Sequence, residues 1–256
     1  MKNIRFAVRL DIKGEYLVKG IQLEGLRKLG SPNEFARKYY GQGIDEIIYI
    51  DIVASLYNRN SLSAIVAEAT KDVFVPLTVG GGLRNLSDVE RALCSGADKI
   101  AINTAAVKTP DIITQVADRY GSQCMVLSIQ AKKQANGRWE AYYDNGREHT
   151  GLDAATWAKH GYERGAGEIL LTSVDRDGTK QGFDLELIRE VSDAVPIPVI
   201  ACGGMRNPQD FVDAIKLGHA DAVAAASILH YGNFQICDIK RYAECTGINV
   251  RIRAGQ

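Results

Sequence analysis

The sequence has no excess of charge of either sign, because Lys plus Arg and Asp plus Glu both number 31. This balance gives no general attraction to nucleic acid or to an anionic membrane, so any phosphate binding must be local. Long hydrophobic runs are also missing. None approaches membrane-spanning length, and the opening MKNIRFAVRL lacks the apolar core of a signal peptide.

Cysteine and histidine are few and scattered. The five cysteines are odd in number and show no C-x-x-C spacing, and the four histidines form no H-E-x-x-H motif. We therefore expect no metal and no cofactor. The same features predict a soluble protein of a reducing compartment, that is, a cytoplasmic one.

Short β-branched runs alternate with amphipathic helical segments along the whole chain. The runs show little polar alternation, which is typical of strands buried on both faces in a parallel sheet covered by helices. No linker divides the chain, so the sequence predicts one domain over residues 1–256 with a (β/α)8 TIM-barrel fold. The expected strands are 4–10, 46–52, 75–80, 99–103, 124–129, 167–173, 197–203 and 220–226.

An internal repeat divides the predicted barrel in two. Segment 75–106 is echoed by 197–228, where Gly81-Gly82 matches Gly203-Gly204. The offset of about 122 residues (203 minus 81) is nearly half of the chain. We therefore predict a barrel built from two duplicated half-barrels.

Glycine-rich turns follow the third and seventh expected strands, as GGG at 80–82 and CGG at 202–204. Glycine lets a backbone approach an anion closely and point its amides toward it. INTAA at 102–106 and AAAS at 224–227 follow the fourth and eighth strands. This duplication predicts two phosphate sites on opposite sides of the barrel mouth. The alternative is that the glycines only shape tight turns.

Seven longer motifs are far more specific than these turns: LDIKGEYLVKG, DEIIYIDIVAS, PLTVGGGLRN, GADKIAINTAAV, RYGSQCMV, GAGEILLTSVDRDGTKQGFDLELI and PVIACGG. Together they resemble the cyclase subunit of imidazole glycerol phosphate synthase. The resemblance runs from about residue 4 to the C-terminal GINVRI.

The resemblance implies an activity and a partner. The cyclase subunit accepts ammonia from a separate glutaminase, with which it forms a 1:1 heterodimer. It joins that nitrogen to a two-phosphate nucleotide, N'-(phosphoribulosyl)formimino-aminoimidazole-carboxamide ribotide. The products are imidazole glycerol phosphate and an aminoimidazole-carboxamide ribotide, in histidine biosynthesis.

Two carboxylates at the barrel mouth act as general acid and base in the family, and the first matches Asp11, at the end of the first strand. An Asp there has the alternative of forming a turn or a helix cap. Lys19, on the first long loop, matches a mobile-loop lysine, whereas composition alone favours a solvated charge. Asp51 and Asp177 have the alternative of holding their loops through backbone hydrogen bonds. The resemblance places substrate and phosphate contacts at Lys19, Asp51, Gly82, Asn103, Thr104, Asp177, Gly178, Gly204, Ala226 and Ser227.

The position of the second family carboxylate holds Gln130. An amide can orient a hydroxyl or a water molecule, but it does not transfer a proton at useful cost. General acid–base catalysis contributes typically ~10²–10⁴-fold, so this change predicts weak turnover unless another group substitutes. Arg9 also departs from the family, in which this position is usually small or apolar. An arginine there would lower the pKa of Asp11.

At the opposite end of the barrel the family guards its ammonia entrance with a ring of charged residues. The matching residues stand at strand starts, and their alternating charges predict a closed salt-bridged network. The alternative is ordinary stabilising charge at that face. The residues of the ring are Arg5, Glu46, Lys99 and Glu168, and Asp98 and Gln123 match the family's contact with its glutaminase.

Three hypotheses for function remain open at this point. The first is the histidine-pathway cyclase, with some group compensating for Gln130. The second is a paralogue that uses the same ammonia delivery to make an amidine or amine on another substrate, such as a surface-polysaccharide sugar. The third is a subunit without catalysis that binds and activates a glutaminase.

Overall fold

A closed barrel of parallel strands forms the centre of the molecule in the computed structural model, which describes residues 3–54 and 62–252. Neighbouring strands pair in the order β1-β4-β5-β6-β7-β10-β11-β12, and β12 pairs with β1 to close the ring. All eight predicted strands are confirmed. They are β1 (Arg5–Lys13), β4 (Glu46–Asp51), β5 (Leu77–Gly80), β6 (Lys99–Ile102), β7 (Met125–Lys133), β10 (Glu168–Ser173), β11 (Val199–Cys202) and β12 (Ala222–Ala225).

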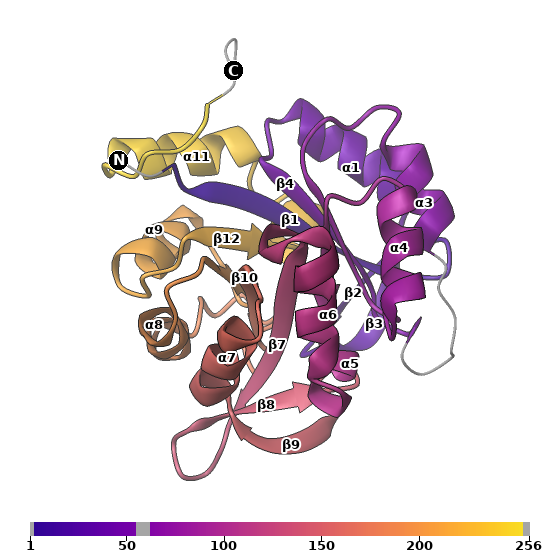
Figure 1. The fold of residues 1–256 in the computed structure, drawn as a ribbon. Coiled ribbons are helices and arrows are strands. Elements are labelled where there is room, and N and C mark those ends of the chain that lie inside the picture. Colours follow the sequence, from indigo (N-terminus) through magenta and orange to yellow (C-terminus); the bar gives the residue numbers. More distant parts are fainter. Residues whose placement is uncertain (1–2, 55–61, 253–256) are drawn as a thin grey trace.

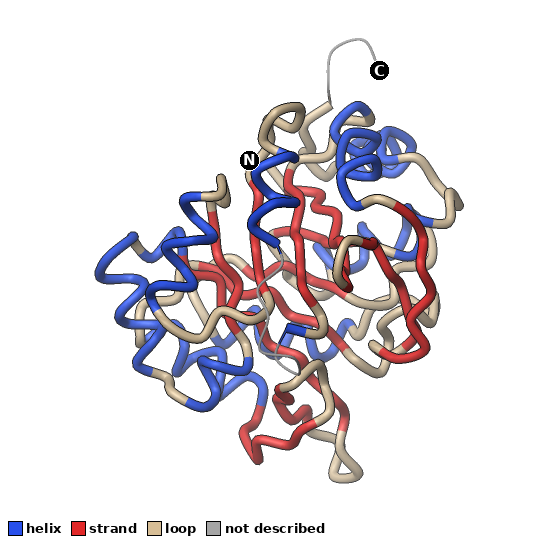
Figure 2. The backbone as a smooth tube through the Cα atoms, turned by 90° about the vertical axis from the view of Figure 1, so that its right-hand side faces the viewer, coloured by secondary structure: helices blue, strands red, loops and turns tan. Residues whose placement is uncertain are grey.

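Helices surround the barrel, so strands lie inside and helices outside in both views (Figures 1 and 2). None of the helices in the two described ranges is long and apolar enough to cross a membrane. The helices are α1 (Pro32–Gly41), α3 (Leu62–Ala69), α4 (Leu86–Cys94), α5 (Thr104–Lys108), α6 (Asp111–Tyr120), α7 (Ala154–Glu163), α8 (Leu185–Ala194), α9 (Pro208–Lys216), α10 (Ser227–His230) and α11 (Ile236–Cys245), with a short 3-10 turn, η1 (Ser122–Cys124).

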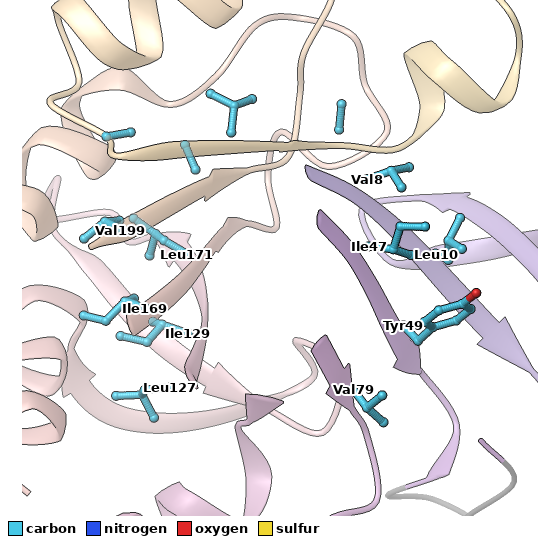
Figure 3. Packing of buried hydrophobic residues seen from close by; sticks show 14 of the residues in the cluster. Val8, Leu10, Ile47, Tyr49, Val79, Leu127, Ile129, Ile169, Leu171 and Val199 are labelled. Carbon is cyan, nitrogen blue, oxygen red and sulfur yellow. The ribbon is translucent and has the colours of Figure 1, made fainter. Parts of the chain in front are cut away.

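The main hydrophobic core lies between the barrel and its helices. Val8 and Leu10 of β1 lie beside Ile47 and Tyr49 of β4, their register partners (Figure 3). Side chains alternate between the two faces of a strand, so every second residue points outward to this layer. The apolar runs of the sequence therefore form strands covered on both faces.

A second, smaller cluster fills the barrel interior. It contains Ala7 of β1, Val126 of β7 and Leu170 of β10, all of them buried. The alternation along each strand then places Arg9 and Asp11 on the interior side of β1 and Gln130 on the interior side of β7. The residues predicted for chemistry thus share one space with the cluster.

Two antiparallel hairpins extend the barrel and were not predicted. The hairpin of β2 (Tyr16–Ile21) and β3 (Glu24–Gly30) follows β1, and that of β8 (Trp139–Tyr143) and β9 (Glu148–Asp153) follows β7. The strand ends expected at Asp11 and Gln130 are therefore wrong. Both strands continue past these residues because antiparallel pairing supplies partners beyond the barrel rim, with Asp11 opposite Val18 and Gln130 opposite Tyr142.

The duplication predicted from the sequence has matching local structure in the two halves. A hairpin follows the first strand of each half, β1 and β7. Asn85 caps α4 by accepting a hydrogen bond from the Asp88 backbone N–H, and Asn207 caps α9 in the same way through Asp210. The repeated letters of the sequence thus correspond to repeated structure.

The C-terminal segment is fastened beside the N-terminus (Figure 1). The ammonium of Lys240, on α11, is almost fully buried and donates to three acceptors. They are the Gly43 carbonyl at 2.7 Å, the Asp45 carboxylate at 2.7 Å and the Arg251 carbonyl at 2.9 Å. This one side chain joins α11 to the loop before β4 and to the chain end.

Lys240→Met is expected to lower the free energy of unfolding by about 3 kcal/mol, because it leaves the buried Asp45 without its nearest cation. Urea unfolding at pH 7 measures the change. Lys71→Met is the control, since Lys71 pairs with Glu68 on the surface and its loss has no measurable effect. An equal loss in both variants would contradict the role given to Lys240.

Candidate active site

A cavity of about 400 Å³ opens at the carboxyl-terminal ends of β4, β5, β6 and β7. This is the end of the barrel where such folds carry their chemistry. Five of the predicted site residues line it, and Asp11 is not among the described residues that do. The five are Asp51, Gly82, Asn103, Thr104 and Gln130.

A second recess, of about 20 Å³, lies at the ends of β10, β11 and β12. The remaining predicted substrate and phosphate residues, with the exception of Lys19, line it, so the two sets occupy separate hollows. The predicted residues of this recess are Asp177, Gly178, Gly204, Ala226 and Ser227.

The glycine pairs shape tight turns, which was the alternative considered for them, and they also border the two hollows. Gly81 and Gly203 have positive φ angles of 93° and 98°. A Cβ at Gly81 would lie 2.1 Å from the Asp51 carbonyl oxygen, and one at Gly203 would lie 2.7 Å from that of Ser173. The first glycine of each pair is therefore required by the turn itself. The second, Gly82 or Gly204, faces the hollow.

Asp11 lies in a buried cluster of charges. Its carboxylate accepts hydrogen bonds from Arg9 Nε at 2.8 Å and from Lys19 Nζ at 3.2 Å. Lys19 also donates to Asp177 at 2.7 Å. Two cations and two carboxylates thus balance one another in the barrel mouth.

The placement expected for Lys19 is wrong. Lys19 does not lie on a loop, as the resemblance implied, but within β2. It is 2 % exposed, so the alternative of a solvated charge is wrong as well. Its burial follows from the hairpin, which brings β2 over the mouth, and from the two carboxylates that replace water around its ammonium.

The cluster holds Asp11 in its ionised form. Burial alone would raise the pKa of Asp11, but the charges of Arg9 and Lys19 lower it below its usual value. Burial would likewise lower the pKa of Lys19, and the carboxylates of Asp11 and Asp177 raise it. The resting site therefore presents a carboxylate and not a carboxylic acid.

The side chain of Arg9 points into the barrel interior. It is 2 % exposed, and its Nη1 donates to Thr172 Oγ1 on β10 at 3.1 Å. Its Nη2 has no hydrogen-bond partner among the described residues. The guanidinium therefore spans part of the barrel interior from β1 toward β10.

Gln130 is 6 % exposed and lies where the second carboxylate of the resemblance was expected. Its Oε1 is buried without a hydrogen-bond partner in the described part of the chain. The position is therefore a real element of the barrel mouth. Its side chain is an amide, whereas the resemblance implied a carboxylate at this position.

The charged ring predicted at the other end of the barrel is closed. Arg5 contacts both Glu46 and Glu168. Lys99 completes the ring with Nζ 3.1 Å from Glu46 and 2.8 Å from Glu168. All four residues stand at strand starts, as predicted.

Asp98 and Gln123 are both exposed just before β6 and β7, at the same end as the ring. Asp98 also has a structural role, because it accepts a hydrogen bond from the Leu77 N–H at 2.8 Å. Its repeat equivalent, Asp221, does the same for Val199 at 3.0 Å. Exposure at this face is compatible with a partner contact.

Comparison with known proteins identifies the family. The model of the histidine biosynthesis protein family matches residues 6–235. A Legionella pneumophila protein named imidazole glycerol phosphate synthase subunit HisF is 60% identical over 211 residues, which are 82% of this chain and 100% of that protein. This chain belongs to the HisF family. It is therefore a subunit of an enzyme, and its family is one of histidine biosynthesis.

Sequence reasoning missed two features of this HisF-family site. Asp144 and Asn145 form the β8–β9 turn with positive φ angles of 47° and 59°, and both line the larger cavity. The letters Asp-Asn-Gly at 144–146 are a hairpin signal that would have found them. His230 has no such signal. It lies behind β1, with Nε2 3.1 Å from the Arg9 carbonyl oxygen and Nδ1 2.8 Å from the Tyr39 hydroxyl.

No group of three or more His, Cys, Asp or Glu side chains within residues 3–54 and 62–252 is placed to hold a metal ion. The five cysteines are all free thiols. Hydrogen bonds and ion pairs are thus the means by which this HisF-family chain builds its site.

The pKa of His230 predicts a pH dependence of stability. Burial, followed by the charge of Lys19, lowers this pKa to about 4 in the folded chain, against about 6.5 when unfolded. Between these values the unfolded chain binds the proton first, so stability falls as the pH falls through this window. Between pH 7 and pH 4 the unmutated chain is expected to lose about 3 kcal/mol more of its free energy of unfolding than His230→Gln does.

Urea unfolding between pH 7 and pH 4 compares the two proteins. Gln at position 230 keeps a donor and an acceptor but cannot gain a proton. His219→Gln is the control, because His219 is exposed and pairs with Asp193. Parallel curves for the unmutated chain and His230→Gln would contradict the expectation.

Proposed function

We propose that this chain is the cyclase subunit of imidazole glycerol phosphate synthase. It uses ammonia from a glutaminase partner to convert the phosphoribulosyl-formimino-aminoimidazole-carboxamide ribotide. The products are imidazole glycerol phosphate and the aminoimidazole-carboxamide ribotide of histidine biosynthesis. The observation that carries the proposal is the 60% identity across the full length of a HisF subunit.

The other two hypotheses are not favoured by the comparisons. Both the family match and the similar protein bear names from histidine biosynthesis. A paralogue with another substrate would draw its support from Gln130 alone. A subunit that only activates a glutaminase would not need a buried, ionised Asp11 in a barrel mouth that also holds a cavity.

The two hollows suit a substrate with a phosphate at each end. In the proposed complex one phosphate contacts Gly82, Asn103 and Thr104. The other contacts the residues of the smaller recess, Gly178, Gly204, Ala226 and Ser227. Support comes from their separation on two sides of one barrel mouth and from backbone amides freed by positive-φ glycines.

Asp11 is the proton-transfer group in the proposed reaction. Because it is ionised at rest, it begins as the general base that accepts a proton from the attacking nitrogen. Arg9 and Lys19 hold its charge and orientation, and Asp177 in turn holds Lys19. Gln130 offers a hydrogen-bond donor and an acceptor to the substrate, and it transfers no proton.

Ammonia reaches this site from the opposite end of the barrel. We place its entrance at the ring of Arg5, Glu46, Lys99 and Glu168, with the glutaminase bound against Asp98 and Gln123. The closed ion pairs of the ring support a gate, since the ring must open for a molecule to pass.

Asp11→Asn is expected to lower ammonia-dependent cyclisation by about 100-fold or more, which is within the range for the loss of a general base. The assay needs the ribotide substrate, ammonium salt and a spectroscopic record of product. Asp193→Asn, at a surface ion pair, is the matched control and keeps full activity. A loss of less than tenfold in Asp11→Asn, with an unchanged circular dichroism spectrum, would remove Asp11 from the mechanism.

The chain is expected to form a 1:1 complex with the glutaminase subunit of its own organism. Size-exclusion chromatography with light scattering gives the stoichiometry, and Gln123→Arg is expected to weaken binding at least tenfold by placing a charge in the contact. Gln181→Arg makes the same change near the opposite end of the barrel and leaves binding intact. Separate elution at micromolar concentrations, or equal weakening by both variants, would contradict the proposed face.

A further inference from the structure

Two buried polar atoms in the barrel interior have no hydrogen-bond partner within residues 3–54 and 62–252, and they are complementary in kind. Arg9 Nη2 is a charged donor, and Gln130 Oε1 is a neutral acceptor. Their side chains are 2 % and 6 % exposed. Leaving either atom unpaired costs about 1–3 kcal/mol, so a hydrogen bond to either atom would stabilise the folded chain.

The two side chains come from different strands and do not hydrogen-bond to each other in this structure. Both face the barrel interior. Arg9 Nη1 already contacts Thr172 on β10 at 3.1 Å. Thr172 is the register partner of Gln130 on the adjacent strand β7, and neighbouring strands lie about 4.8 Å apart. The guanidinium therefore ends next to the strand that carries Gln130.

The charges around this pair are already balanced. Arg9 and Lys19 carry positive charges, and Asp11 and Asp177 carry negative ones. Asp51 is a further buried carboxylate and lines the same cavity as Gln130. A carboxylate at position 130 would therefore add another buried negative charge, which is unfavourable unless it is paired. An amide adds no charge.

We infer that Arg9 is a positioning residue that makes an amide, and not a carboxylate, the working side chain at position 130. A carboxylate there would take the free Nη2 in a charge-assisted hydrogen bond, stay ionised and compete with Asp11 for the guanidinium. The pairing of the two positions is independent of the reaction. Its effect on catalysis rests on the proposed function.

Direct titration tests the pairing without any substrate. The carboxylate introduced by Gln130→Asp gives one extra aspartate side-chain signal in a ¹³C NMR spectrum. We expect it to remain ionised down to about pH 3 beside Arg9. Its pKa is expected to rise by about 1.5 units or more when Arg9→Met is added, because the cation is gone and Asp11 remains as a like charge.

Two further variants make this result decisive. Gln123→Asp introduces a carboxylate on the exposed face, and its pKa is expected to be the same with or without Arg9→Met. Arg9→Lys keeps a charge but loses the planar fork, so it is expected to give a smaller rise in the same direction and serves where Arg9→Met does not fold. Equal pKa values at position 130 in all backgrounds would overturn the proposal.

Kinetics tests the catalytic consequence. Gln130→Asp alone is expected to change ammonia-dependent cyclisation by less than threefold, because an ionised, Arg-bound carboxylate is a poor proton donor. In the Arg9→Met background the same change is expected to raise cyclisation tenfold or more, since the carboxylate can then exchange protons near neutral pH. A tenfold gain from Gln130→Asp with Arg9 present would overturn the inference. Absent turnover in every variant would instead count against the proposed function, and the NMR titration would still decide the pairing.

Discussion

The ion pairs of Asp11 with Arg9 and Lys19 are the interaction on which the barrel mouth depends. Each charge is buried and loses its hydration, so each is tolerable only while its partners stay in place. Lys19 extends the cluster to Asp177 and thereby joins three segments: β1, the β2 hairpin and the loop after β10. Charge balance is thus also a mechanical constraint. The ion pairs of Lys19 with Asp11 and Asp177 hold the hairpin over the mouth.

The duplicated halves share a backbone arrangement and differ in the side chains that their hairpins place at the mouth. A strand, its hairpin and an inward side chain recur at Asp11 and at Gln130. In the first half the hairpin supplies Lys19, which closes on Asp177 beside the small recess. In the second half the hairpin turn of Asp144 and Asn145 borders the large cavity. Divergence of side chains on equivalent hairpins therefore gives one closed and one open side of the mouth.

Sequence predicts the barrel well because its strands are buried on both faces and so carry a strong apolar signal. It also places Glu46, Lys99 and Glu168 at strand starts, because in each case a charged residue stands between a loop and an apolar run. The hairpins escape prediction, since β3 and β9 are mostly exposed and carry no apolar alternation. The burial of Lys19 escapes as well. It depends on Asp177, 158 residues away, and nothing in the local sequence marks a lysine for the interior.

Arg9 carries a positive charge and Gln130 carries none, whereas the resemblance implied a small or apolar residue and a carboxylate at these two positions. Arg9 and Lys19 balance the charges of Asp11 and Asp177 in the cluster. The proposed reaction needs proton removal and proton delivery, and Asp11 can supply both. A carboxylate that accepts a proton in one step can return it in the next, provided that its cations hold it in place throughout. Arg9 and Lys19 meet that condition, because they bind different oxygens of Asp11. The amide at 130 then orients the substrate between two transfers made by a single group.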